Sequence, residues 1–225
     1  MKQGLTEIAF ILDKSGSMHH LVDDTIGGFN SVIQEQREGL GEVYVTTVLF
    51  SDNSKILHDH INIKDVPLLT TNEYRVAGCT ALLDAIGTTI DNIGIRLAET
   101  PEENRPSKVM VFITTDGQEN ASREYTKARI KEMIEHQTNV YNWTFVFLGA
   151  NMDAVAEGRD IGITHSATYT ASSRGVGSTY TVLDDTITAA RAYADVATTA
   201  CSVDTLCSLD ADLAQAIDAK IEAIC

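Results

Sequence analysis

The feature that most constrains the fold is a series of short, continuously apolar stretches that alternate with segments of helical periodicity. Residues 7–12 (EIAFIL) and 109–113 (VMVFI) contain one polar side chain between them, as is typical of strands buried on both faces of a sheet. Residues 21–37 instead place apolar side chains every three to four positions, which indicates an amphipathic helix. This alternation predicts an α/β fold with a mostly parallel sheet and helices on both faces.

The order of these segments is expected to build a single sheet. Asp52-Asn53 separates two strand-like stretches by a short turn, so the second stretch is expected to form an antiparallel edge strand. We predict strands at residues 7–12, 43–50, 54–63, 108–114, 141–148 and 167–170, and helices at 21–37, 81–97, 122–136, 152–159 and 178–196.

The composition changes once this alternation is complete. Beyond residue 197 the chain is enriched in Ala, Ser, Thr and Cys. A length of 225 residues favours one large domain with an extension. We therefore expect a domain at residues 1–197 and a C-terminal appendage at 198–225, helical over 209–224, whose deletion leaves the domain folded.

The charge balance restricts the possible partners. The chain has 17 basic and 32 acidic residues, for a formal net charge of −15, which repels nucleic acid phosphates and anionic membrane surfaces. Residues 1–20 lack the pattern of a secretory signal, and no stretch approaches 18 uninterrupted apolar residues. We expect a cytoplasmic protein that binds neither nucleic acid nor membrane.

Neither cysteines nor histidines predict a metal site. The four cysteines are expected to remain thiols in a cytoplasmic chain, and the C-x5-C-x17-C spacing near the C-terminus lacks the paired ligands of a structural zinc site. His58 and His60 could face one way on a strand, but we expect them to be solvated edge residues.

Three polar stretches stand out against this background. DKSGS at residues 13–17 directly follows the first strand, Thr80 precedes a helix, and Asp116 follows the VMVFI strand within TTDGQEN. Loops at the carboxyl ends of parallel strands converge at one edge of the sheet, so these side chains are expected to meet. Each alone is typical of a helix cap or a turn; together they offer two carboxylates and three hydroxyls.

The donor types select the class of metal. Carboxylate and hydroxyl oxygens are hard ligands that suit Mg²⁺ or Mn²⁺ and not a thiophilic ion. The alternation Asp13-x-Ser15-x-Ser17 lets a tight turn aim all three side chains at one point, and Gly16 gives the backbone the freedom to do so.

These residues resemble the von Willebrand factor A (vWA) domain with its metal-ion-dependent adhesion site (MIDAS), whose signature is DxSxS, a later Thr and a later Asp. The matching positions here are Asp13, Ser15, Ser17, Thr80 and Asp116. The similarity extends over residues 5–196, and TIGGFN resembles the bacterial and phage intracellular branch that includes tellurite-resistance-type proteins. The resemblance implies that Ser15 and Ser17 bind the metal directly and that Thr80 binds it directly or through water. It also implies that Asp13 and Asp116 mainly contact these ligands instead of the metal.

The resemblance also implies a function. A metal that keeps much of its charge can accept an Asp or Glu of a partner protein. Relatives of this kind serve as adaptors in assemblies with ATPases, kinases or phosphatases, and a stress-response setting fits them. Residues expected at the rim of the site are Lys14, Met18, Cys79, Gln118 and Glu119.

The alternative is a metal-assisted hydrolase that uses the same ion. A phosphatase with an Asp nucleophile has a general acid two residues later, and here that position is Ser15. No phosphate-binding GxxxxGK[ST] loop or GxSxG elbow is present, and the GxGxxG-like stretch at 175–180 ends in Tyr180. We therefore expect a binding module and not an enzyme.

Overall fold

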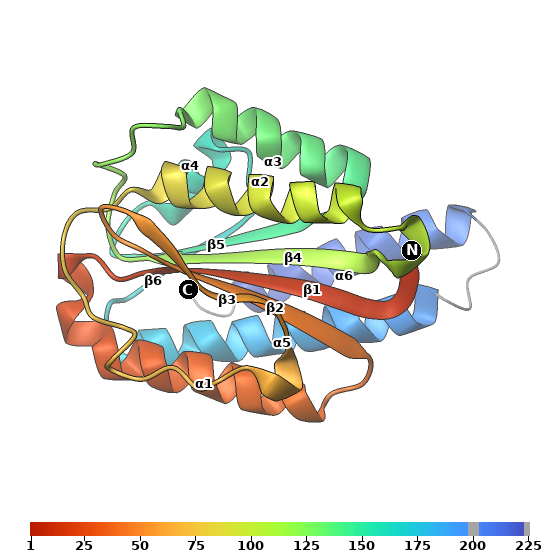
Figure 1. The fold of residues 1–225 in the computed structure, drawn as a ribbon, viewed down its shortest axis with the longest axis horizontal. Coiled ribbons are helices and arrows are strands. Elements are labelled where there is room, and N and C mark those ends of the chain that lie inside the picture. The colour runs from red at the N-terminus through yellow and green to blue at the C-terminus, as the bar shows by residue number, and fades with distance from the viewer. Residues whose placement is uncertain (198–202, 223–225) are drawn as a thin grey trace.

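The computed structural model describes residues 1–197 and 203–222 of the chain. Six strands form one sheet in the order β3-β2-β1-β4-β5-β6, with helices on both faces (Figure 1). β3 is antiparallel to β2, and the other neighbouring pairs are parallel. The predicted α/β class, with a mostly parallel sheet and one antiparallel edge strand, is confirmed. The strands are β1 (Lys2–Asp13), β2 (Glu42–Phe50), β3 (Ser54–Asn62), β4 (Pro106–Thr115), β5 (Thr144–Ala150) and β6 (His165–Tyr169).

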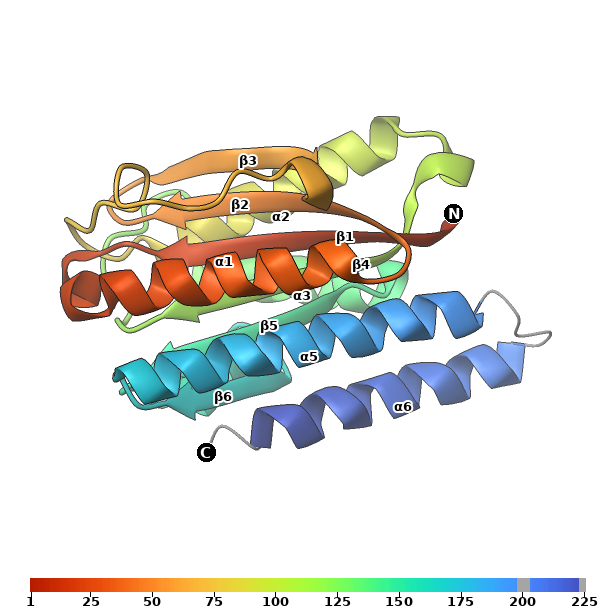
Figure 2. The same ribbon diagram turned by 90° about the horizontal axis from the view of Figure 1, so that it is seen from below.

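The helices form two layers. In Figure 2, α1, α5 and α6 lie together on one face of the sheet, and Figure 1 shows α2, α3 and α4 above the other. Within the described residues, no helix combines the length and apolarity needed to cross a bilayer. The helices are α1 (Val22–Glu38), α2 (Leu82–Glu99), α3 (Lys127–Tyr141), α4 (Ala154–Asp160), α5 (Ser173–Ala197) and α6 (Val203–Glu222), with short 3-10 turns at Gly16–Leu21, Ile63–Asp65 and Glu102–Asn104.

Each central strand contributes to two hydrophobic cores. In β1, Phe10 and Leu12 pack toward α1 and α5, whereas Ala9 and Ile11 pack toward α2 and α3. All four are at most 1% exposed. Both faces of such a strand are buried, so its residues need not alternate between polar and apolar. This accounts for the continuous apolar stretches.

Helix α3 begins five residues later than the expected start at residue 122. Side-chain carboxylates hold the preceding loop in a non-helical course: Glu119 accepts the N–H groups of residues 121 and 122, and Asp84 accepts those of 123–125. Thr126 then caps the helix by accepting from Arg129 N at 3.2 Å. The loop is therefore fixed by long-range contacts that helical periodicity does not reveal.

The two histidines of β3 face opposite sides of the sheet. Both were expected to be solvated edge residues, and neither is exposed. A register shift against β2 inserts a bulge, and His60 there has a positive φ of 50°. His58 is 4% exposed and stacks against Phe29 on the α1 side. His60 instead contacts Glu7 and Arg96 on the α2 side. The bulge thus excludes a shared metal site for these imidazoles.

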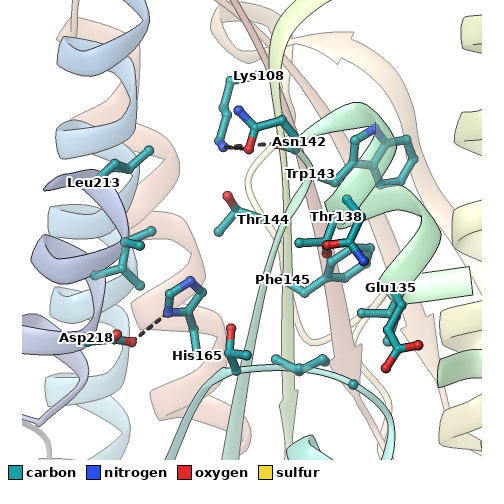
Figure 3. Close-up of a pocket in the computed structure, with 17 residues that line it drawn as sticks. Lys108, Glu135, Thr138, Asn142, Trp143, Thr144, Phe145, His165, Leu213 and Asp218 are labelled. Atoms are coloured by element: carbon teal, nitrogen blue, oxygen red, sulfur yellow. Dashed lines mark hydrogen bonds and ion pairs between the residues drawn. The ribbon is translucent and has the colours of Figure 1, made fainter. Parts of the chain in front are cut away.

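Helix α6 packs against the sheet and α5. It spans residues 203–222, whereas a helix at 209–224 was expected. Leu213, Ile217 and Ile221 are at most 5% exposed and belong to the core on the α1 side. Asp218 also accepts from His165 Nδ1 on β6 at 2.6 Å, and Figure 3 shows this pair at the wall of a cavity of about 570 Å³.

The cysteine expectation can be examined at one position. Cys79 is a free, exposed thiol. Cys201 and Cys225, which the C-terminal spacing includes, lie outside the described residues.

Candidate metal centre

The predicted site residues lie on three loops at the carboxyl edge of the sheet, at the left of Figure 1. Asp13 ends β1, Asp116 directly follows β4, and Thr80 lies two residues before α2. β1 and β4 are parallel neighbours, with Leu12 opposite Thr114. The first and third loops therefore leave the sheet side by side.

Asp13 is the buried anchor of the site. Its side chain is fully buried, and its Oδ1 accepts from the Ser15 backbone N–H at 2.6 Å, so the carboxylate shapes the turn that follows. Its Oδ2 accepts from Thr115 Oγ1 at 2.6 Å, which ties the first loop to the end of β4. Burial raises the pKa of Asp13, and the nearby charge of Asp116 acts in the same direction. A cation beside this carboxylate would stabilise its charged form.

The two serine hydroxyls and Asp116 form a hydrogen-bonded chain. Ser17 Oγ donates to Asp116 Oδ1 at 2.5 Å, and the oxygens of Ser15 and Ser17 are 3.0 Å apart. Since Ser17 has one hydroxyl proton and gives it to Asp116, Ser15 is the donor in the second bond. Asp116 thereby orients the Ser17 hydroxyl, whose oxygen keeps a lone pair for a cation.

The Thr80 hydroxyl reaches the same space, as the surroundings of Gly117 show. A Cβ at Gly117 would lie 3.2 Å from Thr80 Oγ1 and 3.6 Å from Ser17 Oγ. The hydroxyls of the first and second loops therefore both lie beside the third loop, next to a position that a side chain would fill. Glycine leaves this position open.

Two hydrogen bonds with Asn120, one to its side chain and one from its backbone, fix the second loop. Thr80 N donates to Asn120 Oδ1 at 2.9 Å, and Asn120 N donates to Thr80 O at 3.1 Å. On the other side, Gly16 N donates to Gly78 O at 3.0 Å. Gly78 has a φ of +84°, which glycine adopts without strain. Thr80 is thus held between the first and third loops.

Tyr74 holds the start of the first loop through a hydrogen bond. It is 1% exposed, and its hydroxyl donates to the backbone oxygen of Asp13. Burial raises the pKa of Tyr74 well above its ordinary value, so the phenol remains a donor. We did not predict Tyr74, Thr115 or Asn120 from the sequence. Thr115 and Asn120 are adjacent to predicted site residues, whereas nothing in the sequence connects Tyr74 with Asp13.

The five rim residues occupy different environments. Gln118 and Cys79 are exposed beside the site, and Lys14 is partly buried with its Nζ donating to Ser51 Oγ at 3.2 Å. Met18 differs from expectation: it is 2% exposed and packs in the core, so it offers no surface to a partner. Glu119 also turns inward, where it accepts from Leu83 N at 3.0 Å and helps to cap α2.

The chemistry of the donors fits a hard divalent cation. The hydroxyls of Ser15, Ser17 and Thr80, backed by two carboxylates, provide oxygen and no sulfur or imidazole nitrogen. No group of three or more His, Cys, Asp or Glu side chains suited to a metal occurs among the described residues. A cation at this edge would therefore depend on neutral hydroxyls for much of its coordination.

Comparison with solved structures identifies the fold. No protein-family model and no curated protein sequence matches this chain significantly. A von Willebrand factor type A protein from Catenulispora acidiphila aligns with a TM-score of 0.59 and 12% identity, over 82% of this chain and 43% of that one. The vWF domain of the type V pili tip protein Mfa5 from Porphyromonas gingivalis gives 0.58 and 11%, over 83% and 96%. Proximal thread matrix protein 1 from the mussel byssus, with a zinc-occupied MIDAS motif, gives 0.51 and 17%, over 81% and 46%.

The sequence identities to these structures are low. The chain spans less than half the length of the Catenulispora and mussel proteins. With 11% to 17% identical residues, the alignments establish the fold alone. The chain therefore adopts a von Willebrand factor A-like fold, with its three polar loops together at the carboxyl edge of the sheet.

Proposed function

We propose that this chain is a metal-dependent protein-binding module whose MIDAS holds Mg²⁺ or Mn²⁺. Ser15 and Ser17 would bind the metal directly, Thr80 would bind it directly or through water, and Asp13 and Asp116 would orient these ligands. The observation that carries the proposal is that Thr80 Oγ1 and Ser17 Oγ, from separate loops, both border the space that a methyl group at Gly117 would fill. Zinc at the MIDAS of the mussel protein supports a metal at the equivalent edge of this fold.

The ligand of the bound ion is proposed to be an Asp or Glu of a partner protein. Neutral hydroxyl ligands leave a divalent ion with most of its charge, so an incoming carboxylate can complete the coordination. The chain would then act as an adaptor in a cytoplasmic assembly, of the kind that tellurite-resistance-type relatives form with ATPases, kinases or phosphatases.

We propose binding and not hydrolysis, because the buried Asp13 is unsuited to nucleophilic attack. Its side chain is fully buried, and each carboxylate oxygen already accepts a hydrogen bond. Incubation with p-nitrophenyl phosphate and Mn²⁺ should release no more nitrophenol than the Asp13→Ala variant does. Turnover that depends on Asp13 would instead support the hydrolase.

Metal titration tests the site directly. Isothermal titration calorimetry of Mn²⁺ should show one saturable site, and Asp116→Ala should weaken it about 10- to 100-fold, as for other groups that orient metal ligands. Asp59→Ala is a matched control, because Asp59 is an exposed acid on β3, away from the three loops. Equal Mn²⁺ affinity in the Asp116 variant and the parent would remove Asp116 from the site.

Partner capture tests the second part of the proposal. An affinity pull-down with the parent in Mg²⁺ should retain proteins that are lost with EDTA and with Asp13→Ala, but not with Asp59→Ala. Retention of the same proteins in excess EDTA would show that capture uses another face of the domain.

A further inference from the structure

A second candidate site lies at the opposite, amino edge of the sheet. A groove of about 530 Å³ runs between residues 90–98 of α2 and 136–141 of α3, and Arg105 and Trp143 also line it. This volume is within the range of about 300 to 1,000 Å³ that is common for small-molecule sites. We call it the α2–α3 groove. None of the residues proposed to hold the metal lines it.

The α2–α3 groove is open and largely apolar. A Cβ at Gly94 would meet no atom closer than Gln137 Nε2 at 4.0 Å, so the missing side chain leaves space on the α2 wall. Ile95 and Tyr141 line the groove with 61% and 57% of their surfaces exposed. Apolar surface that stays exposed around a hollow is typical of an interaction site.

Trp143 places an unused hydrogen-bond donor in this lining. The residue is 3% exposed, its indole nitrogen is not among the fully enclosed polar atoms without a partner, and its N–H donates to no atom of the described residues. Trp143 lines both the α2–α3 groove and the neighbouring cavity, and in Figure 3 its indole nitrogen points away from Phe145 and Glu135. A ligand oxygen in the α2–α3 groove could accept this bond.

Arg105 supplies a positive charge to the same lining. Its Nε donates to Thr100 O at 2.8 Å and its Nη2 to Ala98 O at 3.2 Å, which fixes the guanidinium without neutralising it. Arg105 forms no ion pair with a carboxylate in the described part of the chain. Asp91 is the one acid among the described lining residues, and it accepts from Tyr125 Oη at 2.7 Å.

We propose that the α2–α3 groove binds a small amphipathic acid, with its carboxylate at Arg105 and its apolar body between α2 and α3. The cation, the unused indole donor and the exposed apolar walls complement an anionic oxygen attached to a hydrocarbon or aromatic group. An amine of the same shape would meet Arg105 with like charge, and an alcohol would leave that charge unpaired. The ligand is therefore selected by its anionic group as well as by its apolar body.

The chain offers a built-in reporter, because Trp143 is its sole tryptophan. Trp143 emission should change saturably when the full chain is titrated with decanoate below its micelle concentration. Decanol should bind about tenfold more weakly and decylamine should not bind, since both lack the charge-assisted hydrogen bonds to Arg105. The response should be the same in EDTA, which separates it from the proposed metal site.

Two variants test the location of binding. Gly94→Leu should fill the groove and abolish the decanoate response, whereas Gly27→Leu should not, because Gly27 lies on α1 with nothing within 4 Å of its added Cβ. Arg105→Gln should lower decanoate affinity about tenfold and remove the preference over decanol. Absence of a saturable response, equal binding of decanoate and decanol, or undiminished binding by a folded Gly94→Leu variant would each overturn the proposal.

Discussion

Replacing Ile217 by alanine should show whether α6 is part of the folded core. Ile217 is 1% exposed and belongs to the core on the α1 side, so its truncation removes buried apolar surface and leaves a void. Such a change typically costs about 2 to 5 kcal/mol. The void would open into the cavity of about 570 Å³ that Ile217 already lines, with Lys108 and His165 in its polar part. Water can enter a polar void. We therefore expect Ile217→Ala to lower the free energy of unfolding by about 2 to 3 kcal/mol, at the low end of that range.

Urea denaturation followed by circular dichroism measures this free energy. Gln215→Ala is the matched control, because Gln215 is exposed on the same helix and should change stability by less than about 0.5 kcal/mol. Truncation after residue 197 should lower the free energy of unfolding by more than the single substitution does, because it also removes Leu213 and Ile221. Burial of each of these side chains stabilises the fold by up to about 1.5 to 3 kcal/mol. If Ile217→Ala matches the control and the truncated chain melts like the parent, α6 is an appendage to the domain.

Three further substitutions test other parts of the structure. Gly117→Ala should weaken Mn²⁺ binding at least tenfold in calorimetry with an unchanged melting temperature, because its methyl group would fill the space beside the hydroxyls; unchanged affinity would place the ion elsewhere. Gly28→Ala should cost about 1 to 3 kcal/mol in urea denaturation, because its Cβ would lie 2.1 Å from the Tyr180 ring; a neutral effect would contradict this packing. Burial alone raises the pKa of Glu7, but the Arg96 guanidinium, which donates to both carboxylate oxygens, and the nearby His60 outweigh burial and hold the pKa below its ordinary value of 4.5. The parent should therefore lose stability more steeply than Glu7→Gln as pH falls through that lowered pKa, and parallel pH curves would argue against a contribution from Glu7.

The parts of the fold that sequence predicts well are those that depend on local pattern. Strands such as β1 and β4 are buried on both faces, so their apolar stretches are visible without knowledge of their partners. Parallel order then brings their carboxyl ends together, which is why Asp13 and Asp116 could be expected to lie close to each other before any coordinates were considered.

The differences arise where distant residues override a local pattern. Residues 121–125 have helical periodicity but give their N–H groups to Glu119 and Asp84 instead of to a helix. A bulge reverses the direction of His60 relative to His58, and a strand pattern of period two cannot show an inserted residue. Met18 follows the metal motif directly in sequence, yet the turn at 16–21 directs its side chain into the core.

The inward course of Glu119 bears on how a chain of charge −15 could accept an acidic partner. In physiological salt the Debye length is about 8 Å, so distant charges are screened and an approaching carboxylate responds mainly to the rim. Under the proposed function, the ion contributes +2 there against Asp13 and Asp116, and Asp13 is fully buried. Glu119 would add a repelling charge if it faced outward, but it caps α2 instead. Under the proposed function, the inward contacts of Glu119 with Leu83 N and with the N–H groups of residues 121 and 122 would therefore keep one further carboxylate away from the approaching partner.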